Sequence, residues 1–278
     1  MGRSPRASQG WPSTDARPAG QTSSKAHRSQ ALQDSFHEHG KAKEVIGRLP
    51  VIALFDIDGT LVDTGGTGAR SWSYAFERLH GVRANIGEHT SAGETDPFVA
   101  RATFEAAIGR APSLDELARL YAAYLLHLSE ELKHATQYRV LDGVESTLAT
   151  LSAAGVTLGI VSGAMEGAAR MKLMPADLNR FFLFGAYGSD SPDRTAITEL
   201  AMRKAERLLG EDIDRRHVFV VGDTPLDVLA ATKAGATSVA VASGKYSVDE
   251  LRDAGADHVL PSLASGFPGT PPMSSRSG

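Results

Sequence analysis

The sequence predicts an α/β fold in which helices cover both faces of a doubly wound parallel sheet. Short, continuously apolar runs recur along the chain, and segments with helical periodicity separate them. Continuous apolar runs of about four to eight residues are typical of strands that are buried on both faces. The composition agrees, because 42% hydrophobic and 22% charged residues are ordinary values for a soluble globular protein.

Five apolar runs are the expected strands, and four segments of helical period are the expected core helices. The strands are 51–55, 156–161, 181–186, 217–221 and 238–242. The helices are 144–153, 166–173, 195–209 and 226–234. This alternation of strand and helix favours a parallel sheet.

One interval interrupts the alternation and predicts a helical insertion after the first strand. From residue 67 to about 138 the sequence shows only helical patterns, in three pieces over 68–79, 97–108 and 114–134. The insertion begins beside Gly65, Gly66 and Gly68, which could act as a hinge.

The two ends of the chain differ in composition from its middle. Residues 1–48 contain eight lysines and arginines against four acids, and their first forty are rich in Ser, Arg, Gln, Gly and Pro. Such a segment cannot bury enough apolar surface to offset its ordering entropy. We therefore expect a disordered tail over 1–48, a core over 49–66 and 140–264, a helical cap over 67–139 and a disordered tail over 265–278.

Charge and composition exclude several classes of protein. The chain has 29 Lys+Arg and 33 Asp+Glu, a net charge of −4, which argues against a dedicated nucleic-acid binder. No apolar stretch approaches the roughly 18 residues that a membrane span needs. The absence of cysteine excludes disulfides and thiolate sites and suits a cytoplasmic location. We thus expect no nucleic-acid partner and no membrane; the sequence leaves the oligomeric state open.

Polar residues follow four of the expected strands. They are Asp56 and Asp58 after the first, Ser162 and Gly163 after the second, Arg194 after the third, and Asp223 and Asp227 after the fourth. Ligands bind at the carboxyl ends of the strands in doubly wound folds. The sequence therefore predicts a site at this edge of the sheet.

Clustered carboxylates repel one another unless a cation or protons neutralise them. Oxygen ligands without histidine or sulfur favour Mg²⁺, so Asp56, Asp58, Asp223 and Asp227 are the candidate metal ligands. One of the first two aspartates could serve as a nucleophile while the other moves a proton. Ser162, the Gly163 N–H and the Arg194 guanidinium could then bind phosphoryl oxygens.

Several of these residues also have a purely structural interpretation. Asp227 could cap the helix that begins near Pro225, and Ser162 could cap the helix that follows it. Arg194 could pair with a neighbouring aspartate on the surface of a helix.

The motifs together resemble the haloacid dehalogenase-like superfamily of phosphatases. Residues 56–64 (DIDGTLVDT) resemble its first signature, and Ser162 lies where its second signature places a hydroxyl residue. Residues 222–227 (GDTPLD) resemble its fourth signature. The resemblance covers about residues 51–260. It implies a strand order of 3-2-1-4-5, Asp56 as the nucleophile, and Asp58 as the acid and base. It also implies Mg²⁺ on Asp56, the Asp58 carbonyl and Asp223, with Asp227 nearby.

The third signature usually carries a lysine, and the matching place here holds Arg194, whereas Lys172 and Lys204 lie at other positions. The inserted helices resemble the small cap of the phosphoglycolate phosphatase-like branch. That branch has a cap loop, and Gly93, Thr95 and Asp96 match its motif. The resemblance implies hinges at 64–66 and 137–143 and a lid that selects the substrate. The same cap residues could instead form only a loop and a helix N-cap.

The expected function is Mg²⁺-dependent hydrolysis of a small phosphorylated metabolite, of the phosphoglycolate or sugar phosphate type, through an aspartyl-phosphate. Three alternatives remain at this stage. A phosphomutase uses the same aspartate, a dehalogenase needs no metal, and a non-catalytic binding protein could use the same scaffold.

Overall fold

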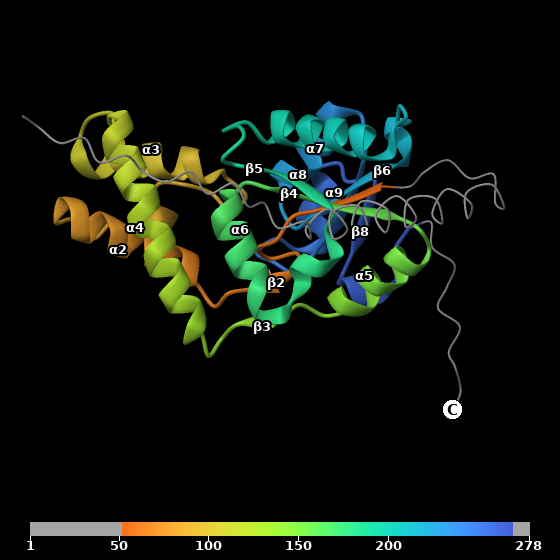
Figure 1. The fold of residues 1–278 in the computed structure, drawn as a ribbon, viewed down its shortest axis with the longest axis horizontal. Helices are drawn as coiled ribbons and strands as arrows, with labels where there is room; N and C mark the ends of the chain where they lie inside the picture. Colours follow the sequence, from red (N-terminus) through yellow and green to blue (C-terminus); the bar gives the residue numbers. More distant parts are fainter. Residues whose placement is uncertain (1–51, 269–278) are drawn as a thin grey trace, which may run out of the picture. The chain divides into compact units, whose positions relative to one another are not determined.

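Six parallel strands form the central sheet in the computed structural model, which describes residues 52–268 (Figure 1). They are β1 (Ile52–Phe55), β4 (Thr157–Ser162), β5 (Phe184–Tyr187), β6 (Val218–Gly222), β7 (Thr237–Val241) and β8 (His258–Leu260). The order is β5-β4-β1-β6-β7-β8, so β1 lies in the middle between β4 and β6. The predicted α/β class and the order of the five expected strands are confirmed, and β8 extends the sheet beyond them.

Strand β1 is buried on both faces, as its apolar run predicts. All four of its residues are fully buried. Because side chains alternate along a strand, Ala53 and Phe55 join one hydrophobic cluster, whereas Ile52 and Leu54 join the other. The sheet therefore has a buried apolar cluster on each face, and β1 contributes to both.

Helices cover both faces of the sheet. The first cluster includes residues of α5 (Val144–Ala153) and α6 (Glu166–Leu173), and the second includes residues of α7 (Arg194–Leu209) and α8 (Pro225–Ala234). Figure 1 shows α7 and α5 on opposite sides of the strands. The bounds of α5 and α6 match the prediction, and α7 and α8 each begin one residue earlier than expected.

The sequence prediction misses several short elements. The predicted strand over 181–186 is wrong at its start, because 3-10 helix η3 (Leu178–Phe181) occupies the chain before β5. Leu178 and Phe182 are nevertheless buried, so the apolar run packs against the core without pairing as a strand. Outside the inserted segment and its two linkers, the other unpredicted elements are α9 (Val248–Asp253), β8 and the 3-10 helices η2 (Met174–Ala176), η4 (Arg215–His217) and η5 (Leu263–Ser265).

The inserted segment is helical throughout, apart from its loops. It contains α2 (Thr67–His80), η1 (Ile86–Glu88), α3 (Asp96–Ile108) and α4 (Leu114–Lys133). The Trp72 ring of α2 stacks on the Tyr124 ring of α4 with centroids 4.1 Å apart. Both side chains are almost fully buried, so the three helices have an apolar core of their own that continues into the first cluster.

The chain enters and leaves the inserted helices through one small ribbon. Strand β2 (Val62–Asp63) pairs antiparallel with β3 (Arg139–Val140). The Arg139 Nη2 atom lies 3.0 Å from Asp63 Oδ2 across this pair. The two linkers are therefore joined to each other, which the sequence prediction did not anticipate.

The predicted tails fall largely outside the described residues. The segment 1–48 lies outside them entirely, as does 269–278. Within the segment 265–278, Phe267 is 7% exposed, and its ring centroid lies 5.7 Å from that of Phe219. None of the helices within 52–268 combines the length and apolarity that a membrane crossing requires.

Candidate active site

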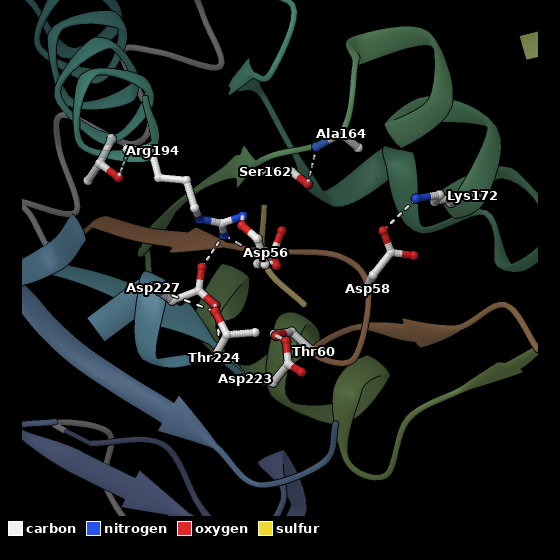
Figure 2. Close-up of polar contacts among 12 residues, drawn as sticks. Asp56, Asp58, Thr60, Ser162, Ala164, Lys172, Arg194, Asp223, Thr224 and Asp227 are labelled. Carbon is white, nitrogen blue, oxygen red and sulfur yellow. Dashed lines mark hydrogen bonds and ion pairs between the residues drawn. The ribbon is translucent and has the colours of Figure 1, made fainter. Parts of the chain in front are cut away.

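Three of the four predicted acidic residues, Asp56, Asp223 and Asp227, meet at the carboxyl edge of the sheet (Figure 2). Asp56 follows β1 directly and Asp223 follows β6, its neighbour in the sheet. The backbone N–H of Asp56 donates to the Val221 carbonyl at 2.8 Å, which continues the pairing of the two strands to the site. Adjacent parallel strands thus place both aspartates at the same edge.

Three carboxylates form a compact buried cluster. Asp56, Asp223 and Asp227 are 5%, 4% and 3% exposed, and each offers an oxygen within 4.8 Å of the others. Hard oxygen donors at this spacing suit a divalent cation such as Mg²⁺. The Asp58 carboxylate is not part of the cluster, although Asp58 was predicted with these ligands.

Burial and mutual repulsion disfavour the charged forms of the carboxylates in this cluster. Desolvation raises the pKa of Asp223 to about 8, and repulsion from Asp227 and Asp56 adds to the effect. Desolvation also raises the pKa of Asp56 to about 6, although the Arg194 guanidinium lowers it in part. A cation among these oxygens would remove the repulsion, so the electrostatics of the residues fit the metal site that their geometry suggests.

Two glycines leave room for the Asp223 carboxylate. A Cβ atom on Gly59 would lie 2.3 Å from Asp223 Oδ2, and one on Gly244 would lie 1.8 Å from the same oxygen. Gly59 also has φ 77°, a left-handed conformation that disfavours other residues. The Thr60 hydroxyl donates to Asp223 Oδ1 at 3.3 Å. The backbone therefore surrounds Asp223 closely and fixes its position.

Replacing Gly244 by alanine is expected to displace Asp223 and to lower the affinity for Mg²⁺ by at least about tenfold, as loss of support around a metal ligand commonly does. Isothermal titration of Mg²⁺ measures this effect. Gly167→Ala is the matched control, because its added methyl would meet Leu125 at an ordinary 3.6 Å. Unchanged Mg²⁺ affinity in Gly244→Ala would show that Asp223 does not bind the metal.

Asp227 serves both as a helix cap and as part of the site. Its Oδ2 accepts from the Thr224 N–H at 3.1 Å and from the Thr224 hydroxyl at 2.7 Å, in a capping box at the start of α8. Its Oδ1 accepts from Arg194 Nη2. Asp227 therefore caps α8 and also belongs to the carboxylate cluster.

Arg194 lies in the site and not on the helix surface. It is the first residue of α7, and only 11% of its side chain is exposed. Its Nη2 atom contacts Asp227 Oδ1 and lies 3.4 Å from Asp56 Oδ2, and its Nη1 donates to the Gly93 carbonyl at 2.7 Å. The alternative of a solvated surface pair is thus wrong, and the guanidinium is the cation nearest to Asp56 among the described ion pairs.

Asp58 turns away from the other carboxylates. Its Oδ2 accepts from Lys172 Nζ at 2.5 Å, and Figure 2 shows this pair on the opposite side of Asp56 from Arg194. Lys172 lies outside the sequence motifs. A signal was nevertheless present, because Lys172 follows Ala168 and Ala169 on the buried stripe of α6, where an apolar residue would be expected.

Ser162 and Gly163 form the turn that leads from β4 toward α6. The Ser162 hydroxyl accepts from the Ala164 N–H at 3.3 Å, and Ser162 is 2% exposed. A Cβ atom on Gly163 would lie 2.9 Å from Arg194 Nη1 and 2.8 Å from the Glu94 carbonyl. Gly163 therefore allows both the guanidinium and the loop before α3 to approach the turn.

The loop Gly93–Asp96 docks on this same turn. The Asp96 N–H donates to the Gly163 carbonyl at 2.8 Å, and Asp96 Oδ2 accepts from the Met165 N–H at 2.8 Å. Thr95 accepts from the Phe98 N–H at the start of α3 and donates to the Pro192 carbonyl at 3.0 Å. Thr95 thus acts as an N-cap, and the loop also lies against the edge where the carboxylates gather.

Comparison with known proteins agrees with this architecture. Residues 53–241 match the family of haloacid dehalogenase-like hydrolases. A phosphoglycolate phosphatase from Rhodospirillum rubrum is 31% identical over 236 residues, which cover 79% of this chain and 92% of that protein. A 5'-nucleotidase from Pseudomonas aeruginosa is 28% identical over 76% of this chain and 91% of its own length.

A solved structure shares the fold at lower sequence identity. The crystal structure of a predicted phosphoglycolate phosphatase from Haemophilus somnus superposes with a TM-score of 0.63 at 20% identity, covering 78% of this chain and 96% of that one. The family match spans more than half of the chain and includes four of the site's aspartates. The chain is therefore a member of the haloacid dehalogenase-like hydrolases.

Proposed function

We propose that the protein hydrolyses a small phosphate monoester with the help of Mg²⁺, through an aspartyl-phosphate on Asp56. The observation that carries this proposal is the buried cluster of Asp56, Asp223 and Asp227 with the Arg194 guanidinium beside it. Phosphoryl transfer of this kind uses a carboxylate nucleophile, a metal site and a cation that can bind phosphate in a bidentate manner.

Asp56 and Asp58 have separate tasks in this reaction. An Asp56 carboxylate oxygen forms a bond to phosphorus as the bond between phosphorus and the leaving oxygen breaks, and Asp58 gives its proton to that oxygen. Water then attacks the phosphorus of the aspartyl-phosphate, the bond between phosphorus and the Asp56 oxygen breaks, and Asp58 takes a proton from the water. The products are the free alcohol and inorganic phosphate, and both aspartates return to their initial states.

Asp56, the Asp58 carbonyl, Asp223 and Asp227 are the residues proposed to hold or surround the metal. When bound, Mg²⁺ supplies positive charge that lets a carboxylate approach a phosphate dianion. Ser162, the Gly163 N–H and Arg194 are proposed to bind the phosphoryl oxygens, for which the planar guanidinium offers a fork of donors.

The docked cap loop supports a small substrate. Gly93 contacts Arg194, Thr95 contacts Pro192 and Asp96 contacts the turn after β4, so we expect the leaving group of the substrate to meet this loop. The two named relatives are a phosphoglycolate phosphatase and a 5'-nucleotidase. We infer a phosphorylated metabolite of the phosphoglycolate or sugar phosphate type, in a cytoplasmic setting.

A panel of phosphorylated metabolites, assayed for phosphate release with Mg²⁺ and with a chelator, tests the proposal. We expect at least one small monoester to be hydrolysed, and chelation to lower the rate by at least about a hundredfold, because the carboxylate cluster then repels the substrate. A hexose 1-phosphate in the panel separates the alternatives. Its conversion to the 6-phosphate without phosphate release would indicate a phosphomutase, whereas full activity in chelator would contradict the metal-dependent mechanism.

A further inference from the structure

Lys172 is a buried cation to which the reaction above assigns no task. It is 5% exposed and is the only lysine or arginine in the buried class within residues 52–268. Lysine is seldom buried unless it is paired, since its ammonium group loses hydration. The carboxylates of Asp58 and Asp96 compensate for this loss at Lys172.

The ammonium group lies where the core and the inserted helices meet. Asp58 follows β1, Asp96 begins α3, and Lys172 lies near the end of α6. The Tyr138 hydroxyl, in the returning linker, donates to the Lys172 carbonyl at 2.9 Å. A Cβ atom on Gly68, in the first turn of α2, would come to 4.0 Å from Nζ. Lys172 is therefore held in place by several segments at once.

This arrangement holds one oxygen of Asp58 and leaves the other available. Lys172 Nζ lies 2.5 Å from Asp58 Oδ2, whereas no side chain or N–H within 52–268 donates to Oδ1. The Asp58 side chain is 47% exposed, in contrast to the buried Lys172 side chain at 6%. An exposed carboxylate is thus held through one oxygen by a buried ammonium group, and Figure 2 shows the pair.

We propose that Lys172 is a positioning residue for proton transfer by Asp58: it binds Oδ2 so that Oδ1 delivers the proton to the leaving oxygen. The inference rests on the proposed function, because it assumes that Asp58 is the acid. As the bond between phosphorus and the leaving oxygen breaks, the proton moves from Asp58 to that oxygen, and the resulting carboxylate stays paired with the ammonium group. Lys172 itself touches neither the phosphoryl group nor the leaving group.

A purely structural task for Lys172 predicts a different pattern of activity. If Lys172 only stabilised the packing around Asp96, its loss would lower activity on every substrate alike. Positioning of the acid predicts a selective loss, because a poor leaving group needs the proton and a good one does not. The leaving group of the substrate therefore distinguishes the two tasks.

The test compares kcat/KM for an alkyl phosphate and for 2,4-dinitrophenyl phosphate, with Mg²⁺ present. For Lys172→Met we expect a loss of about thirtyfold or more on the alkyl ester and of less than about threefold on the dinitrophenyl ester, within the range of general acid catalysis. Asp58→Asn should show the same selectivity. In the Asp58→Asn background, Lys172→Met should cause little further loss, since the residues act as one unit.

The matched control is Lys133→Met, which removes an exposed lysine of α4 and should change neither value. Equal losses on both esters for Lys172→Met, or additive losses in the double variant, would overturn the proposal. If Lys172→Met does not fold, Lys172→Arg keeps the charge at an altered position and should show a smaller loss of the same selectivity; equal losses on both esters would again refute positioning. The alkyl ester is a substrate found with the metabolite panel; wild-type protein that hydrolyses no monoester of that panel would instead refute the proposed function, and the positioning task with it.

Discussion

Asp56→Asn protein is expected to fold like the wild type and to release no measurable phosphate from any substrate. The amide cannot form the aspartyl-phosphate, so the rate should fall by at least about a thousandfold. Burial and repulsion already raise the pKa of Asp56, so removal of its charge should not destabilise the fold. Phosphate release measures activity, and circular dichroism with thermal unfolding measures folding.

Two additional measurements make the Asp56 result specific. Asp249→Asn is the control, because its side chain is 85% exposed on α9 and the variant should retain full activity. Acid quenching of wild-type protein during turnover, followed by peptide mapping, should find the phosphoryl group on the peptide that contains Asp56. Residual turnover in Asp56→Asn near the wild-type rate would contradict covalent catalysis by this residue.

The second large effect is expected at Asp223. Asp223→Asn should abolish the stabilisation of the protein by Mg²⁺, which for a site at a hundred times its dissociation constant is about 2.7 kcal/mol. Activity should fall by at least about a hundredfold, because one carboxylate of the proposed metal site is lost. Thermal unfolding with and without Mg²⁺ measures the first effect. An undiminished thermal shift in the variant would place the metal elsewhere.

Asp223 should also make the metal-free protein less stable as the pH rises. Its pKa is near its ordinary value of 3.8 in the unfolded chain and about 8 in the folded one. Between these values the folded state binds more protons, so raising the pH lowers the free energy of unfolding, by on the order of 1 kcal/mol per pH unit. Chemical denaturation in chelator from pH 5 to pH 8 measures this slope. The slope should be smaller in Asp223→Asn and in wild type with Mg²⁺, and a slope that the substitution leaves unchanged would contradict the assignment.

The sheet was predictable because strands buried on both faces have a simple signature. The run at 51–55 is apolar at every position, and the helices that flank the sheet have clear periodicity. Strand β8 lacks this signature, since His258 is exposed and Val259 and Leu260 are only partly buried at the edge of the sheet. The two-residue strands β2 and β3 are too short to form any pattern, so only their pairing in space shows them.

The site was partly predictable because its residues follow strands that end at one edge. This reasoning located Asp56, Asp223 and Arg194, which the structure brings together. It missed Lys172, because that residue does not follow a strand but projects from α6 and reaches Asp58 only through the tertiary fold. Asp227 also shows that a capping contact and a contact within the candidate site can belong to the same side chain, which a choice between the two interpretations conceals.

The hydrogen bond from Arg194 Nη1 to Gly93 is accepted by a backbone carbonyl, so it does not depend on the side chains around it. Gly93 itself is constrained, because φ is 89° and a Cβ atom would lie 2.6 Å from the Thr224 hydroxyl oxygen. The neighbouring Glu94 approaches the turn at Gly163 through its backbone carbonyl. The Phe98 side chain is 45% exposed. Directed evolution of substrate preference can therefore randomise positions 94 and 98 while the hydrogen bond between Arg194 and the Gly93 carbonyl stays intact.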